Sequence, residues 1–116
     1  MLQLLLPWLS AFLFGQALEM PVYALPLRRL GLRGGRLWLH AFAPTGLTHP
    51  IVWFVFPQLL PMSYLVMCIA AETFAVVSEA IYLRVVGVRR PLGWSLLANG
   101  LSCGGALASR ALFGWP

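Results

Sequence analysis

The chain has 116 residues, of which 60% are hydrophobic and only 9% are charged, and its mean hydropathy is +0.84. Soluble proteins contain about 25% charged residues, so this composition excludes an ordinary soluble domain and predicts an integral membrane protein. A helical crossing of the bilayer needs about 20 apolar residues, so residues 1–116 have room for four spans in a single membrane domain. The net charge of +5 comes from eight basic and three acidic residues. The basic residues are arginines in predicted loops or at their edges, a pattern typical of membrane topology and not of a nucleic-acid surface.

The first span is predicted over about residues 2–27. The N-terminus has no basic n-region, and no small-residue cleavage site follows the apolar stretch. We therefore expect this span to be retained and not removed as a signal peptide. Gly15, Glu19 and Pro21 interrupt its apolar character. Residues 28–36 then form a glycine-containing turn with four arginines. The positive-inside rule places this turn in the cytoplasm, so the N-terminus is expected outside.

The second span, about residues 37–56, contains two prolines, Pro44 and Pro50. A proline inside a helix removes a backbone hydrogen bond and tends to bend the axis. In a membrane, the carbonyl groups left unpaired need a threonine side chain, a neighbouring helix or water. We therefore expect a kinked helix, and the alternative is two half-helices that meet near residues 45–48. The uncharged residues 57–61 are predicted to form an outer turn.

The third and fourth spans, about residues 62–86 and 92–113, flank a second basic segment at residues 84–90. Seven of the eight arginines lie in or beside segments 28–36 and 84–90, and only Arg110 lies toward the other side. Both segments are therefore predicted to be cytoplasmic, with both termini outside. The predicted fold class is all-α, a polytopic membrane protein built as a four-transmembrane-helix bundle.

Polar side chains inside the four spans predict a polar column in the bundle. Glu72 and Glu79 are seven residues apart, so they share a helix face, separated by about 10.5 Å along the axis. An ionisable side chain at the bilayer centre costs about 2.5 to 3.5 kcal/mol, so buried glutamates need to be paired, protonated or hydrated. The predicted ion- or proton-binding constellation is Glu19, His49, Glu72, Glu79 and Asn99, with Tyr23, Thr48 and Ser102 as supporting residues.

The depth of each polar side chain follows from counting residues from the nearest inner arginine, at about 1.5 Å each. His49, Glu72 and Cys103 come out at one level, while Glu79 comes out nearer the cytoplasm. Imidazole, carboxylate and thiolate are ligands of zinc, so these three residues are a candidate site for a divalent metal. Cys68 and Cys103 both fall in predicted spans and are expected to be reduced packing residues.

Three functions are compatible with this constellation. The leading prediction is proton- or metal-cation-linked transport or binding. The alternatives are a non-catalytic membrane subunit or assembly factor, whose polar column is structural, and an intramembrane metalloenzyme. The common metalloprotease, serine-hydrolase and phosphate-loop motifs are absent from the sequence. The expected partners are the lipid bilayer and a second copy of the chain or a larger membrane complex, because four spans make a narrow bundle for transport; nucleic acid is not expected.

Four short motifs are spread along the chain: Glu-x-Pro-x-Tyr at residues 19–23, Thr-His-Pro at 48–50, the two glutamates of the third span, and Ala-Asn-x-x-Ser at 98–102. In this order they resemble a group of small four-span bacterial inner-membrane proteins. The resemblance covers most of the chain and implies the same fold in a bacterial inner membrane. It brings no activity with it, so the function is predicted from the residues alone.

Overall fold

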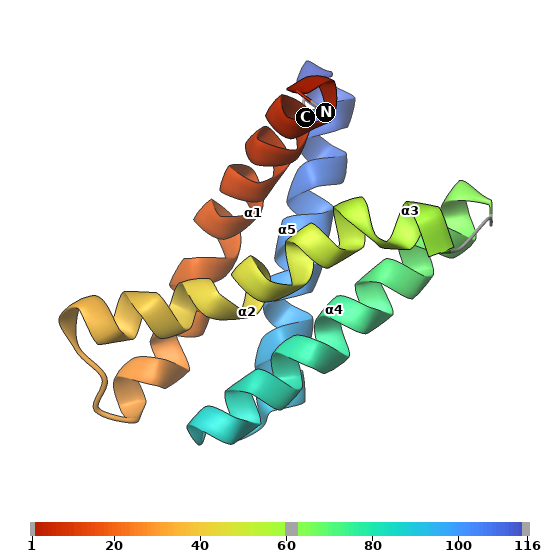
Figure 1. Cartoon of the computed structure of the whole chain (residues 1–116). Helices are drawn as coiled ribbons and strands as arrows, with labels where there is room; N and C mark the ends of the chain where they lie inside the picture. Colours follow the sequence, from red (N-terminus) through yellow and green to blue (C-terminus); the bar gives the residue numbers. More distant parts are fainter. Residues whose placement is uncertain (1, 60–62, 115–116) are drawn as a thin grey trace.

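The computed structural model describes residues 2–59 and 63–114, and most of these residues are helical (Figure 1). The elements in chain order are α1 (Leu2–Arg29), α2 (Gly34–Phe54), the single turn α3 (Phe56–Leu59), α4 (Tyr64–Val86) and α5 (Pro91–Phe113). The predicted all-α class is confirmed, and the four long helices follow the four predicted segments. The predicted outer turn overlaps α3, and its residues 60–61 lie outside the described residues.

The helix ends follow from local sequence signals. The Ser63 hydroxyl accepts a hydrogen bond from the Val66 N–H at 3.3 Å, which caps the start of α4. Gly87 follows the last turn of α4 with φ +112°, a left-handed conformation that glycine adopts without a steric penalty. Pro91 occupies the first turn of α5, where its missing N–H leaves no hydrogen bond broken. These signals set the short turn between α4 and α5 that carries the second basic segment.

Two helices are long and apolar enough to cross a membrane, Leu5–Arg29 within α1 and Tyr64–Val86, which is α4. The remaining long helices are less apolar because of their composition. Two histidines, two prolines and Arg36 lower the hydropathy of α2, and glycine, serine, Asn99 and Arg110 lower that of α5. By length and composition, the described residues therefore contain two candidate spans where the sequence predicted four.

The helices pack as two antiparallel pairs that cross (Figure 1). α1 lies beside α5, and both chain ends lie at the same end of this pair. α2 runs obliquely across α1 and also packs on α4, which in turn packs on α5. One hydrophobic cluster joins the residues near the two arginine-rich turns, including Leu27, Leu37, Leu83 and Val88. The two basic turns are therefore neighbours at one end of the bundle.

α2 continues through both of its prolines as one helix, so the alternative of two half-helices is wrong. The Thr48 hydroxyl lies 3.2 Å from the carbonyl oxygen of Pro44, within the helix interior. Packing of α2 against α1 and α4 supports the backbone where proline weakens it. The proline kink itself stays a prediction.

Replacing Arg90 with glycine is expected to raise the free energy of unfolding by about 1 kcal/mol. Arg90, which precedes α5, has φ +56°, and no other non-glycine residue in the described chain has a positive φ. Glycine adopts this conformation without a clash of its side chain. Thermal unfolding in detergent measures the change. Arg89→Gly removes the same charge without relieving a positive φ, so an equal gain in that variant would show that charge, and not the backbone, is responsible.

Candidate functional site

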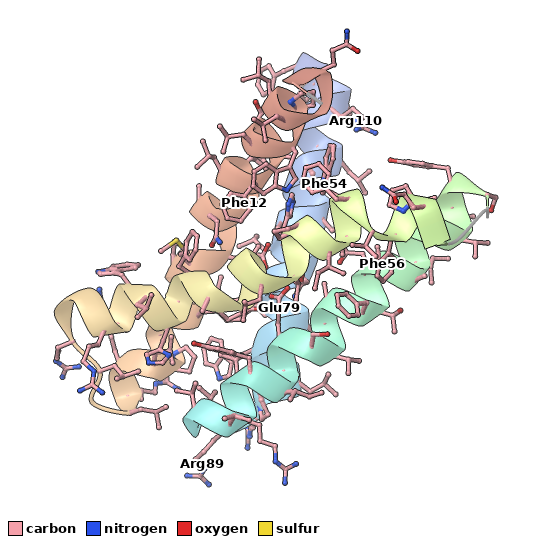
Figure 2. The ribbon with its side chains drawn as sticks, viewed as in Figure 1. Phe12, Phe54, Phe56, Glu79, Arg89 and Arg110 are labelled. Atoms are coloured by element: carbon pink, nitrogen blue, oxygen red, sulfur yellow. The ribbon has the colours of Figure 1, made fainter. Side chains whose placement is uncertain are left out.

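The interior of the bundle contains polar side chains from all four long helices. Figure 2 shows Glu79 where the helices come together. The fully buried Tyr23 shares this interior with two glutamates, two threonines of α2 and an asparagine of α5. The buried polar residues are Gln16, Glu19, Thr45, Thr48, Glu79, Ser95 and Asn99.

Glu79 on α4 accepts hydrogen bonds from three neighbouring helices. The Tyr23 hydroxyl of α1 donates to Oε1, and the Thr48 hydroxyl of α2 donates to Oε2 at 2.9 Å. The Asn99 amide of α5 donates to Oε1 at 3.2 Å. Every one of these contacts places a donor against a Glu79 oxygen. This is the environment that suits an ionised carboxylate, which can only accept.

Glu19 on α1 is the second buried carboxyl group. The Thr45 hydroxyl donates to its Oε1 at 2.9 Å. The carboxyl groups of Glu19 and Glu79 themselves interact directly. Polar residues of α1, α2 and α5 thus enclose a pair of carboxyl groups. We call Glu19 and Glu79 the carboxyl pair.

Serine and asparagine on α5 fix this helix against α4. The Ser95 hydroxyl donates to the carbonyl oxygen of Val76 at 2.7 Å, and the Asn99 amide also lies 2.9 Å from the Ser95 carbonyl oxygen. Residues 95, 99 and 102 are spaced by four and three positions, so they lie on one helix face. The same rule places residues 16, 19 and 23 on one face of α1. The buried polar residues of α1 and of α5 therefore each lie on a single helix face.

Glu72 is not a member of the buried network, contrary to the predicted constellation. Its side chain is exposed on α4, whereas Glu79 is 1% exposed. Glu72 lies seven residues, nearly two helical turns, away from Glu79 along α4. The depth count placed His49, the neighbour of Thr48, level with Glu72, but Thr48 bonds to Glu79. The depth count assumed parallel helix axes, whereas α2 runs obliquely across its neighbours (Figure 1).

His49 also lies outside the network. Its ring packs among the aromatic rings of Trp8, Phe12 and Trp53, with centroid distances of 6.3, 5.5 and 6.1 Å. Thr48 points to the carboxyl pair, so the next residue along the helix turns about 100° away from it. Within the described residues, no group of three or more His, Cys, Asp or Glu side chains could hold a metal ion. The predicted metal site of His49, Glu72 and Cys103 is therefore not assembled.

Three polar residues of the interior were not predicted as site residues. Thr45 bonds to Glu19, Ser95 bonds to the α4 backbone, and the Gln16 amide donates to the carbonyl oxygen of Phe42 at 3.1 Å. Thr45 could have been found from the sequence, because it is three positions from Thr48 and shares its helix face. Cys68 and Cys103 are free thiols, as predicted.

A groove of about 410 Å³ between α2 and α4 reaches the edge of the buried network. Apolar side chains form most of its lining, and Thr48 and Tyr82 are also part of it. The Tyr82 hydroxyl lies 2.7 Å from Nδ1 of His40. Since Thr48 also bonds to Glu79, one side chain separates this groove from the carboxyl pair.

The site combines two buried carboxyl groups with three donors directed at one of them. No arginine or histidine is among the hydrogen-bonding partners described for the pair. Such a site can exchange a proton or hold the helices in register. The chain matches no known protein family, and no curated protein or solved structure matches it.

Proposed function

We propose that the protein is a four-span membrane bundle of a bacterial inner membrane, with both termini outside and the basic segments 28–36 and 84–90 in the cytoplasm. Each long helix exposes large apolar side chains, such as Leu13, Leu47, Ile69 and Leu107. A soluble protein rarely exposes apolar surface on every side, whereas a bilayer stabilises it. Among the described residues, seven polar side chains are instead buried inside the bundle, which also suits a lipid environment.

We infer that the carboxyl pair holds one proton and that the protein binds or transports protons through it. The observation that carries this proposal is that Glu19 and Glu79 are both buried in one hydrogen-bonded interior, where their carboxyl groups interact. Two carboxylates in contact repel one another strongly when both are ionised, and a shared proton removes the repulsion. Glu79 accepts three donors, so the proton belongs on Glu19, which then donates to Glu79 while its other oxygen accepts from Thr45.

A proton suits this network better than a metal cation. The side chains around Glu79 contact it directly, with Thr48 at 2.9 Å and Asn99 at 3.2 Å. An ion coordinated by these oxygens would have to displace hydroxyl and amide donors that already occupy them. The metal-cation form of the transport hypothesis and the metalloenzyme hypothesis both lack a ligand set among the described residues.

Infrared spectroscopy of the purified protein tests the shared proton. A protonated carboxyl group has a carbonyl stretch that is distinct from the bands of a carboxylate and an amide. We expect this band at neutral pH in the parent protein and in Glu72→Gln, and its loss in Glu19→Gln. A band that persists in Glu19→Gln, or that disappears in Glu72→Gln, would place the proton elsewhere.

Proton movement is tested in proteoliposomes with an internal pH-sensitive dye and an imposed membrane potential. We expect Glu19→Gln to lower the rate of proton entry by about tenfold or more, the scale typical of losing a proton-transfer group. Glu72→Gln is the matched control and should keep the parent rate. If Glu19→Gln folds normally and retains the parent rate, the pair does not carry protons.

The alternative function, a non-catalytic membrane subunit or assembly factor, is favoured by one observation. The buried hydrogen bonds connect α1, α2, α4 and α5, so the network also fixes how the helices pack. This role needs no proton exchange. A normal rate of proton entry in Glu19→Gln would therefore support it, and association with a second copy or a larger membrane complex would be the next property to measure.

A further inference from the structure

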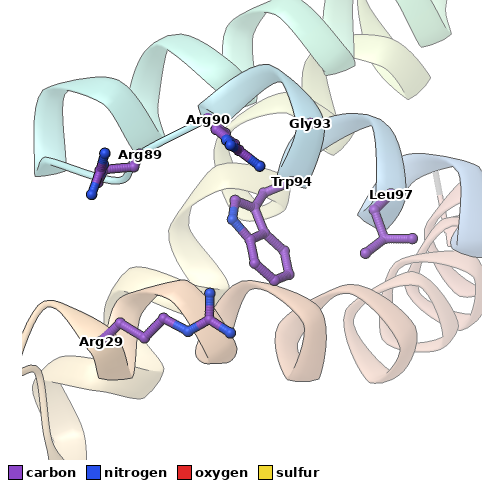
Figure 3. Close-up of a pocket in the computed structure, with 6 residues that line it drawn as sticks. All are labelled: Arg29, Arg89, Arg90, Gly93, Trp94 and Leu97. Carbon is purple, nitrogen blue, oxygen red and sulfur yellow. The ribbon is translucent and has the colours of Figure 1, made fainter.

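A pocket of about 460 Å³ lies at the basic end of the bundle, away from the carboxyl pair. It is formed where the last turn of α1 meets the turn between α4 and α5 (Figure 3). Arginine side chains come from both elements, and an indole ring lies between them. The lining residues are Arg29, Arg89, Arg90, Gly93, Trp94 and Leu97.

The three arginines give this pocket a concentrated positive charge that no glutamate of the chain offsets. Glu19 and Glu79 are buried in the network. Glu72 lies on α4 more than two helical turns before the α4–α5 connection. The Arg29 guanidinium lies 5.8 Å from the centroid of the Trp94 ring, which holds it at the pocket. A site of this charge is complementary to an anion, and guanidinium groups bind phosphate oxygens in pairs.

The other residues that line the pocket favour a lipid headgroup over a small free anion as its ligand. Leu97, one turn further along α5 than Gly93, extends the pocket from the arginines toward the apolar helix surface. Trp94 places an aromatic ring between the charged and apolar parts, as tryptophan does at membrane interfaces. Basic pockets between helices on the cytoplasmic side of a membrane are suited to anionic headgroups.

We propose that the pocket lined by Arg29, Arg89, Arg90 and Trp94 binds the phosphate of an anionic phospholipid headgroup, with an acyl chain along α5 near Leu97. This inference uses the four-span arrangement to place the pocket at the headgroup level. It is independent of proton exchange at the carboxyl pair, so either property can fail without the other.

Native mass spectrometry of the full chain in neutral detergent tests the proposal. The probes are phosphatidylglycerol and phosphatidylcholine with identical acyl chains, and inorganic phosphate as a competitor. We expect one phosphatidylglycerol to bind with about tenfold preference over phosphatidylcholine, a scale consistent with one or two charge-assisted contacts. The preference should fall below about twofold in the variant Arg29→Gln/Arg89→Gln/Arg90→Gln.

The matched control is Arg28→Gln/Arg33→Gln/Arg36→Gln, which removes three charges from the neighbouring basic turn and leaves the pocket lining intact. This variant should retain the preference for phosphatidylglycerol. An equal loss of this preference in both triple variants would overturn the assignment of lipid binding to the pocket, because a general attraction to positive charge would then explain the preference. Displacement of the lipid by an equal concentration of inorganic phosphate would overturn the lipid assignment.

Folding of each variant is checked by circular dichroism, and the single variant Arg29→Gln provides a milder test. We expect Arg29→Gln to weaken phosphatidylglycerol binding by about fivefold, the scale of losing one arginine contact with an anionic headgroup. Unchanged binding in a folded Arg29→Gln would contradict the proposed role of the α1 arginine.

Discussion

Replacing Glu79 with alanine is expected to lower the free energy of unfolding by about 3 to 5 kcal/mol. The substitution removes the acceptor of three buried donors, the Tyr23 hydroxyl, the Thr48 hydroxyl and the Asn99 amide. Each buried donor without a partner costs about 1 to 3 kcal/mol, and some of these groups can pair again with a backbone carbonyl. Unfolding of the purified protein in mixed detergent micelles measures the loss.

Glu72→Ala is the matched control, because it removes the same side chain from the same helix. Glu72 is exposed and accepts none of the hydrogen bonds of the network, so the expected change is within about 0.5 kcal/mol. The contrast tests which of the two glutamates of α4 belongs to the site. Equal losses in the two variants would contradict the arrangement in which only Glu79 reaches the interior.

Glutamine is expected to be tolerated at position 19 and poorly tolerated at position 79. If Glu19 carries the proton, a glutamine there reproduces its pattern, with Oε1 accepting from Thr45 and the amide donating to Glu79. The expected loss in the free energy of unfolding is below about 1 kcal/mol. A glutamine at position 79 instead directs its amide hydrogens at a donor, so we expect a loss about 2 kcal/mol larger.

This asymmetry is measured on the same unfolding curves as the alanine variants. It depends on the proton position and not on proton movement, so it remains informative even if the protein transports nothing. The reverse order, with Glu19→Gln the more destabilising change, would assign the proton to Glu79. Small and equal losses in the free energy of unfolding would mean that both positions tolerate a donor as well as an acceptor, which would contradict the proposed proton position.

The depth of the polar residues could not be read from the sequence. Residue counting gives depth only when helix axes are parallel, and α2 crosses the other helices obliquely (Figure 1). For this reason Thr48 meets Glu79 and not Glu72. His49, the next residue along α2, turns about 100° away, toward the aromatic rings of Trp8 and Phe12. The two arginine-rich segments lie near one another at one end of the bundle. That both lie on the cytoplasmic side of a membrane stays a prediction.

Composition and periodicity by themselves determined that the chain is helical and where its four long helices lie. These properties depend on residues close in sequence, whose spacing is set by the 3.6-residue repeat and by local start and stop signals. Only the tertiary structure decided that Glu19 and Glu79 form a pair and that Glu72 is left outside. That choice depends on the angle at which helices pack, which arises from side-chain contacts between distant segments and has no signature in any single helix.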